Sequence, residues 1–345
     1  MLETVGYIGL EDAEEGMNCG FGCAAHLIKA GYKVNLFDTN KGQVDKLVAK
    51  GGIACGSPKE VAEKSSVVFI MQYDTPDVEN ILFGKDGVVE GIKANSVVID
   101  MSSILPEAEK KFGAKLQELG VELVDAPVNG GAYRSRHERS TLNMLVGGSD
   151  EAFKRVKPLL DIVARIIIHI GPTGTGQATK VATQMLNAIE IASLTEMFVY
   201  AYKAGCDVAQ VREAMLLRWC DEGLIENHSM RAIQHEFNGF YLDEHRRDLR
   251  FALQGALDYD VSIPITAVVA QQFNAEAAEG GGMLDHCSVM KIAEKNANCT
   301  VEPGHLDPNV QETYEKMCRK KVANVLEYRG YPSAEFTVDD ISSWG

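Results

Sequence analysis

The stretch Gly174-Thr175-Gly176-Gln177-Ala178-Thr179-Lys180-Val181-Ala182-Thr183-Gln184 separates two differently patterned parts of the chain. It is a glycine-rich turn that opens directly into a long, largely apolar helical pattern. Lys180 and Gln184 are four residues apart, so a helix places them on one face. A lysine on a mostly buried helix can serve as a general acid or base, because burial lowers its pKa. Taken alone, the stretch is explained more simply by a surface lysine at a helix start.

Short apolar runs alternate with amphipathic stretches before this turn. The helical patterns include residues 23–30, which end at Gly31, and residues 43–49. The apolar runs predict strands at residues 5–8, 33–37, 66–71, 96–100, 122–124 and 142–146. Strands and helices that alternate at this spacing predict βαβ units and a parallel sheet.

Helical patterns dominate after the turn. They cover residues 176–204, 207–217, 221–234, 243–258, 264–278 and 286–295, with one more at 309–328. A chain of 345 residues exceeds the usual size of one domain. We therefore expect an N-terminal α/β domain over residues 1–172, an all-α domain over residues 173–296 and a C-terminal extension over residues 297–345.

Composition excludes several classes of function. A net charge of −15 argues against a protein that binds nucleic acid or anionic membranes, since both need a basic face. No apolar run approaches the length of a membrane span, and the N-terminus lacks a signal-peptide pattern. The eight cysteines are scattered; the spacing of Cys19, Cys23 and His26 is equally well explained by one helix face. We expect no metal site and a reduced, cytoplasmic location.

The first strand leads into a glycine-containing loop, a helix and a second strand that ends in an acid. Gly9 ends the first strand, Gly16, Gly20 and Gly22 precede the helix, and Asp38 ends the second strand. Glycines let a pyrophosphate approach the backbone, and an acid at this place accepts hydrogen bonds from ribose hydroxyls. The pattern indicates a Rossmann dinucleotide-binding domain that prefers NAD to NADP.

The usual G-x-G-x-x-G spacing is interrupted in this loop. An acidic insertion, residues 11–15, follows Leu10 and would repel phosphates unless it loops outward. A glycine-rich turn without a ligand therefore stays open as an alternative.

Two later motifs place polar groups after predicted strands. Ser102 and Ser103 follow Asp100, and their hydroxyls suit a carboxamide or a substrate, although such serines are often helix caps. Asp125-Ala126-Pro127-Val128-Asn129-Gly130-Gly131 exposes backbone N–H groups that can hold a carboxylate, with Asn129 as a further donor.

A basic segment follows the two glycines. Arg134, Arg136, His137 and Arg139 lie within ten residues of Gly131 in a strongly acidic chain. Guanidinium groups suit carboxylate, phosphate or sulfonate, so the segment indicates a substrate with a second anionic group. A solvated loop that balances nearby acids, or a subunit contact, explains it equally well.

Taken in order, these motifs and the later Arg247-Asp248-Leu249 resemble those of the β-hydroxyacid dehydrogenase family. The family includes 3-hydroxyisobutyrate dehydrogenase and tartronate semialdehyde reductase, and 6-phosphogluconate dehydrogenase is a relative. The resemblance covers about residues 4–296. It implies a Rossmann domain and an all-helical domain, joined by the long helix that carries a catalytic lysine.

The resemblance implies roles for individual residues. Lys180 matches the catalytic lysine and Gln184 its amide partner. The substrate residues it implies, together with those indicated by the basic segment, are Ser103, Asn129, Gly130, Gly131, Arg134 and Arg136. The expected cofactor residues are Gly9, Leu10, Gly20, Asp38, Met71, Ser103 and Arg247. Asn129 stands where serine is usual, and Arg247 where a lysine is usual.

We therefore expect an NAD-dependent oxidoreductase, with NADP less favoured, that interconverts a small anionic β-hydroxy acid and its aldehyde or keto form. Family members suggest a homodimer or homotetramer. A non-catalytic homologue that binds ligands or acts as a scaffold is the alternative, favoured by the interrupted glycine loop. An imine reductase is a second rival, but such relatives commonly lack the lysine found at Lys180.

Overall fold

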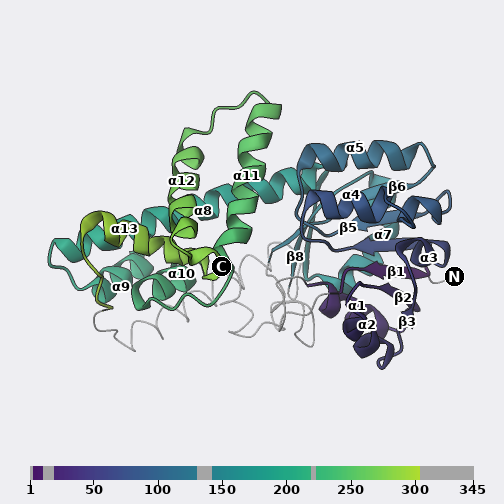
Figure 1. The fold of residues 1–345 in the computed structure, drawn as a ribbon, viewed down its shortest axis with the longest axis horizontal. Coiled ribbons are helices and arrows are strands. Elements are labelled where there is room, and N and C mark those ends of the chain that lie inside the picture. The colour runs from purple at the N-terminus through teal and green to yellow at the C-terminus, as the bar shows by residue number, and fades with distance from the viewer. Residues whose placement is uncertain (1–2, 11–18, 130–141, 219–222, 304–345) are drawn as a thin grey trace. The chain divides into compact units, whose positions relative to one another are not determined.

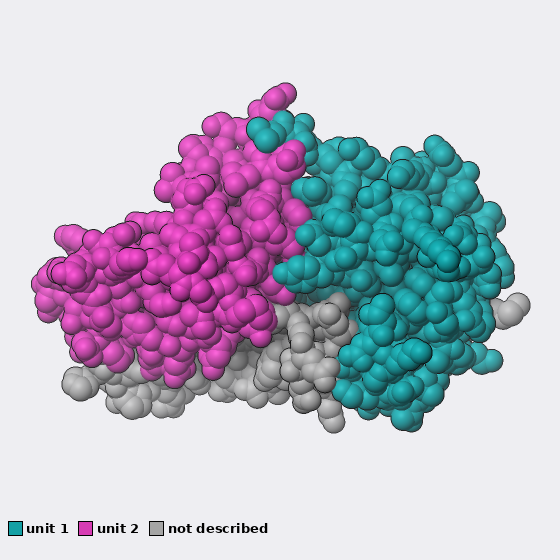
Figure 2. Space-filling view, viewed as in Figure 1, with its two compact units in different colours: residues 1–183, 257–259 teal, residues 184–256, 260–345 magenta. Residues whose placement is uncertain are grey.

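A computed structural model describes residues 3–10, 19–129, 142–218 and 223–303 of the chain. The chain divides into two compact units, coloured separately in Figure 2. The first comprises residues 1–183 with 257–259, and the second residues 184–256 with 260–345. Each unit is described by itself below.

The first unit is built on one sheet whose first six strands run parallel (Figure 1). These are β1 (Val5–Ile8), β2 (Val34–Phe37), β3 (Ile53–Ala54), β4 (Val67–Ile70), β5 (Val97–Asp100) and β6 (Glu122–Asp125). Their order is β3-β2-β1-β4-β5-β6. The predicted α/β Rossmann architecture is confirmed, since parallel neighbours joined by helices define it.

The far end of the sheet differs from the prediction. β8 (Asn143–Gly147) pairs antiparallel with both β6 and β7 (Val128–Asn129), so the expectation that the strand at 142–146 joins a parallel sheet is wrong. The reason is local: the chain runs from β6 through Ala126-Pro127 into β7, and β8 then returns alongside both. β9 (Ile166–Gly171), which the residue pattern did not predict, pairs parallel with β8.

Alternating side chains of the central strands build two separate cores. Val5 and Phe69 belong to one core, and Ile8 and Val68 belong to the other, as the period of two in a strand requires. The first core is covered by α1 (Gly20–Lys29), α2 (Lys41–Val48) and α7 (Asp150–Val163). The second is covered by α3 (Pro58–Glu63), α4 (Thr75–Phe83), the short η1 (Val88–Glu90) and α5 (Pro106–Gln117).

The second unit is helical, as predicted. It contains most of α8 (Thr175–Lys203) and α11 (Leu242–Asp258), together with α9 (Val208–Arg218), α10 (Gly223–Gln234), α12 (Pro264–Ala278), η2 (Gly281–Met283), η3 (His286–Val289) and α13 (Met290–Ala297). Phe198, Leu249, Phe273 and Met290 lie in its core. The helix predicted at 286–295 is a 3-10 turn followed by an α-helix, and the one predicted at 309–328 lies outside the described residues. No helix in the described part of the chain is both long and apolar enough to cross a membrane.

Candidate active site

A buried carboxylate at the end of β6 holds the first turn of α8. Asp125 Oδ1 accepts a hydrogen bond from the backbone N–H of Gly174 at 2.7 Å, and Oδ2 accepts one from Gln177 N–H at 2.8 Å. A Cβ at position 176 would lie 2.8 Å from Asp125 Oδ2, which is too close. The carboxylate can approach the backbone here because residue 176 is a glycine. Negative charge is favourable at a helix N-terminus. Asp125 therefore fixes where the helix that carries Lys180 begins.

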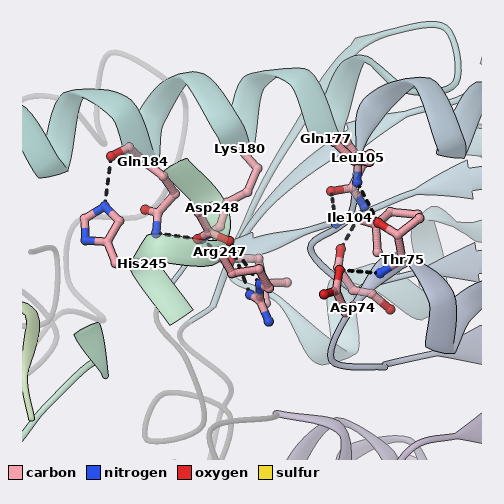
Figure 3. Close-up of polar contacts among 12 residues, drawn as sticks. Asp74, Thr75, Ile104, Leu105, Gln177, Lys180, Gln184, His245, Arg247 and Asp248 are labelled. Atoms are coloured by element: carbon pink, nitrogen blue, oxygen red, sulfur yellow. Dashed lines mark hydrogen bonds and ion pairs between the residues drawn. The ribbon is translucent and has the colours of Figure 1, made fainter. Parts of the chain in front are cut away.

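The side chain of Gln177 fastens the same turn to the loop after β5. Its amide donates to Ser102 O at 2.7 Å. Its carbonyl oxygen accepts from Ile104 N–H at 3.2 Å (Figure 3). The Ser102 hydroxyl accepts a bond from Gln72 N–H at 2.9 Å. Ser102 therefore makes hydrogen bonds within the fold through both its hydroxyl and its carbonyl group. Ser103, the predicted ligand-binding residue, follows it and is half-buried.

Lys180 lies one turn into α8, and its ammonium group reaches β7. Nζ donates to Asn129 Oδ1 at 2.6 Å and to Val128 O at 3.0 Å. The lysine is only 8% exposed. The structure therefore excludes the simpler explanation of a surface lysine, and it brings two predicted site residues, Lys180 and Asn129, into direct contact. Both contacts are charge-assisted hydrogen bonds, which fix the ammonium group more firmly than neutral ones.

Gln184 lies one turn further along α8 and contacts α11. Its Nε2 donates to Asp248 Oδ2 at 2.9 Å, and the second oxygen of Asp248 accepts from Arg247 at 3.2 Å (Figure 3). Gln184, Arg247 and Asp248 are all buried. Asp248 was not among the predicted site residues. Its place in the Arg247-Asp248-Leu249 motif was the one sequence feature that pointed to it. It orients both predicted site residues.

The loop after β1 has the backbone shape expected at a dinucleotide site. Gly9 has φ +94°, and a Cβ there would lie 1.9 Å from Met71 O, so only glycine fits. Met71 N–H in turn donates to Ile8 O at 2.9 Å. The chain can therefore turn closely over the sheet edge, where ligands bind in open α/β sheets.

Asp38 is half-buried at the end of β2 and is held by two backbone donors. Leu10 N–H donates to Oδ2 at 2.6 Å, and Asn40 N–H donates to Oδ1 at 2.7 Å. Each carboxylate oxygen has a second lone pair. The Asp38 side chain is thus preorganised and keeps the capacity to accept bonds from ribose hydroxyls.

Helix α1 begins three residues earlier than predicted, at Gly20. Gly20 and Gly22 are therefore buried in its first turns instead of in the preceding loop. The side chain of Cys19, which precedes the helix, makes no capping hydrogen bond. A helix N-terminus that follows a glycine-containing loop fits a pyrophosphate.

Three buried acids, Asp100, Glu109 and Asp125, lie close enough to one another for their charges to interact. Burial raises the pKa of Asp100 to about 6, and the nearby Asp125 charge adds to this. Burial, together with the charges of Asp100 and Asp125, raises the pKa of Glu109 well above its usual value. Asp100 and Glu109 are fully buried, so they hold protons far more tightly than exposed carboxyls.

Several predicted site residues lie outside the described residues. They are Gly130, Gly131, Arg134 and Arg136, and with them the acidic insertion at 11–15.

Two family profiles match the chain in succession. One, described as the NAD binding domain of 6-phosphogluconate dehydrogenase, matches residues 4–171. The other, described as NAD-binding of NADP-dependent 3-hydroxyisobutyrate dehydrogenase, matches residues 174–293. The 2-hydroxy-3-oxopropionate reductase of Escherichia coli is 37% identical over 296 residues, which cover 85% of this chain and 98% of that protein.

The chain belongs to the β-hydroxyacid dehydrogenase family. A second relative, the 3-hydroxyisobutyrate dehydrogenase of Pseudomonas aeruginosa, is 32% identical over 286 residues, or 80% of this chain and 95% of that protein. A solved structure of Mycobacterium tuberculosis 3-hydroxyisobutyrate dehydrogenase with L-serine shares the fold, with a TM-score of 0.77 and 24% identity. The match covers 85% of this chain and 99% of that one.

Membership of the β-hydroxyacid dehydrogenase family confirms the resemblance drawn from the motifs. The protein is an NAD(P)-dependent oxidoreductase that acts on CH–OH groups, and its relatives are dehydrogenases and reductases of hydroxy acids. These relatives favour an enzyme over the non-catalytic alternative. Both profiles describe dinucleotide-binding domains, so the cofactor is NAD or NADP.

Proposed function

We propose that the protein interconverts a small β-hydroxy acid and its aldehyde or keto form, with Lys180 as the general acid and base. The contact of the Lys180 ammonium with Asn129 Oδ1 and Val128 O carries the proposal. A buried lysine held at the end of a strand, one turn into the helix after the Rossmann domain, is placed for proton transfer rather than for solubility.

The nicotinamide supplies the hydride chemistry, and the chain supplies placement and proton transfer. In oxidation, Lys180 Nζ takes the proton of the substrate hydroxyl group. In reduction, the same ammonium group donates a proton to the forming alkoxide. Gln184 holds the substrate oxygen, and Asp248 fixes the Gln184 amide so that little motion is needed.

We assign the substrate carboxylate to Asn129, Gly130 and Gly131. Two successive glycines expose backbone N–H groups that suit a carboxylate. Arg134 and Arg136 follow closely, and we propose that they bind a second anionic group of the substrate, such as a carboxylate, phosphate or sulfonate.

We propose NAD as the preferred cofactor, bound by Gly9, Leu10, Gly20, Asp38, Met71, Ser103 and Arg247. The Asp38 carboxylate supports this preference because it would repel the 2′-phosphate of NADP. The hydrogen bonds from Leu10 and Asn40 hold it in place before the cofactor arrives.

We further propose a cytoplasmic homodimer or homotetramer. Free thiols at the described cysteines Cys19, Cys23, Cys55, Cys206, Cys287 and Cys299 support a reducing compartment. Exposed apolar side chains on the helical unit, including Leu186, Tyr200, Ile265 and Val268, support a subunit contact.

A substrate panel tests the proposed reaction. Reduction of NAD and of NADP is followed with β-hydroxy acids, α-hydroxy acids and simple alcohols, each β-hydroxy acid being paired with an analogue that carries a second anionic group. We expect turnover of β-hydroxy acids only, and the highest kcat/KM for a dianionic member. Equal turnover of α- and β-hydroxy acids would contradict the proposed substrate class.

Arg134→Ala and Arg136→Ala variants separate the second-anion assignment from the reaction itself. Each variant should lose kcat/KM for the dianionic substrate and keep it for the matched monoanion. If both substrates respond alike, the arginines do not bind a second anion, although the β-hydroxy acid assignment still stands.

A further inference from the structure

A cluster of metal-ligating side chains lies in the helical unit, apart from the residues assigned to catalysis. One ring nitrogen each of His228 and His286 and the sulfur of Cys287 lie within 4.8 Å of one another. All three side chains are buried, with exposures of 6%, 5% and 0%. His228 lies on α10, and the other two begin η3. Folding thus brings together residues almost sixty positions apart in the sequence.

Two successive hydrogen bonds fix the tautomers of the His245 and His286 rings. His245 Nε2 lies 2.9 Å from Gln184 O, and His245 Nδ1 lies 2.9 Å from His286 Nδ1. A carbonyl oxygen can only accept, so His245 Nε2 carries the hydrogen and His245 Nδ1 is the acceptor. His286 Nδ1 must then be the donor. The lone pair of His286 therefore lies on Nε2.

His286 Nε2 is a buried acceptor that meets no hydrogen-bond partner among the described residues. Buried polar atoms in folded proteins nearly always have a partner. A neutral imidazole whose other nitrogen donates to a fixed acceptor is the arrangement found in metal-ligating histidines.

The charges around the cluster suit a cation bound with a thiolate. Asp285 is fully buried, accepts Cys287 N–H at 2.9 Å and pairs with Arg231 at 2.6 Å. The Asp285–Arg231 pair cancels its own charge. The Cys287 thiolate, formed when the metal binds, would supply the negative charge that a divalent ion needs.

We propose that His286 Nε2, His228 and Cys287 Sγ bind a divalent ion of the zinc class, with a water in the fourth position. Two imidazoles and one thiolate match the preference of Zn²⁺ for nitrogen and sulfur. Ligand atoms around tetrahedral zinc are about 3.5 Å apart. Binding therefore requires the three side chains to close by roughly 1 Å, which side-chain rotations provide.

The bound ion would stabilise helix α8, which carries Lys180 and Gln184. His286 would connect it through His245 to the backbone carbonyl of Gln184, whose side chain contacts Asp248. The metal ligands themselves take no part in the proposed hydride transfer. The site is therefore structural, and its occupancy can be measured without reference to activity.

Cobalt binding to the full-length protein tests the proposal. Co²⁺ is titrated into chelator-treated protein, and the thiolate-to-cobalt charge-transfer absorption is recorded. We expect one equivalent of Co²⁺ per chain, displacement by Zn²⁺, and a Zn²⁺-dependent rise in Tm of about 5 °C or more. Absence of the absorption in the native protein overturns the proposal, and this arm needs no variant to fold.

Two variants of the proposed ligands and one control variant locate the site. Cys287→Ser should abolish the charge-transfer absorption and the rise in Tm, whereas Cys206→Ser, at an exposed free thiol, should keep both. His286→Gln should weaken binding at least tenfold. An absorption that persists in Cys287→Ser places the metal elsewhere and overturns the assignment. Loss of the absorption in Cys206→Ser does the same.

Discussion

The ammonium group of Lys180 and the side-chain oxygen of Asn129 are joined by a 2.6 Å hydrogen bond. The contact links the first turns of α8 to β7, between residues 51 positions apart in the sequence. Asn129 therefore does more than offer a donor to a substrate carboxylate, the role expected from the sequence. It also accepts from the ammonium group that we propose as the proton carrier, and so fixes its position.

Removing this acceptor should slow catalysis without weakening cofactor binding. We expect Asn129→Ala to lower kcat by about 10- to 100-fold, since a hydrogen bond to a charged group contributes about 1.5–3 kcal/mol. The dissociation constant of NAD should stay unchanged, because Asn129 is not among the proposed cofactor contacts. Steady-state kinetics and NAD titration measure the two quantities. Asn296→Ala, at an exposed position of α13, is the control and should retain kcat.

The Asp125 carboxylate should stabilise the fold through the start of α8. The Asp125→Asn substitution retains the shape of the side chain. It replaces one of the two acceptor oxygens by an NH2 group, a donor that would face a backbone N–H donor. We expect the free energy of unfolding to fall by about 1–3 kcal/mol, the cost of a buried donor left unpaired. Denaturant titration measures it. Asp86→Asn is the matched control: Asp86 is exposed and has φ +55°, which asparagine tolerates. An equal loss in both variants would contradict the role of Asp125.

Asp100 should make stability depend on pH in the direction opposite to an ordinary ion-paired acid. Its pKa is raised by burial to about 6 in the folded protein, above the value of 3.8 for an exposed group. Its contribution is therefore present at low pH and is lost as the pH rises from about 4 to 6.

Replacing Asp100 by asparagine isolates that contribution. The free energy of unfolding of Asp100→Asn, relative to the native protein, should rise by about 1–3 kcal/mol between pH 4 and pH 8. Glu109→Gln should change in the same direction, because burial also raises the pKa of Glu109. Urea unfolding at several pH values measures the difference. A difference that stays constant or falls with pH would show that these carboxyls are ionised without cost.

Asp38 should determine the preference for NAD. We expect the native protein to have a higher kcat/KM with NAD than with NADP, because the carboxylate repels a 2′-phosphate. Asp38→Ser should narrow the preference and Asp38→Arg should reverse it. Kinetics with both cofactors at saturating hydroxy acid measure the ratio. Equal kcat/KM for NAD and NADP in the native protein would refute the assignment.

Local periodicity predicted most of the fold. Apolar runs such as residues 67–70 are buried on both faces of a parallel sheet and stand out from the amphipathic helices around them. The direction of β8 was mispredicted, because strand direction depends on how the chain returns and not on side-chain pattern. The predicted start of helix α1 was three residues too late. Glycine has a low helix propensity, yet Gly20 and Gly22 are buried in the first turns of this helix.

Sequence motifs identified some residues of the candidate site. Contacts between residues far apart in the sequence could not be predicted in this way. Spacing placed Lys180 and Gln184 on one helix face, and the resemblance to the family gave the two residues their roles. The capping of α8 by Asp125 joins residues about fifty positions apart, and no local pattern shows it. The cluster of His228, His286 and Cys287 has no recognisable ligand spacing, so the sequence predicted no metal site there.

The kcat of Lys180→Ala, measured beside the dissociation constant of NAD, tests the central proposal most directly. Lys203→Ala, at the exposed end of the same helix, is the control. We predict that kcat for the preferred β-hydroxy acid falls by about a hundredfold to ten-thousandfold, the usual effect of losing a general acid and base. NAD binding should be unchanged, and Lys203→Ala should match the native protein. A Lys180→Ala variant that keeps near-native kcat would contradict the account.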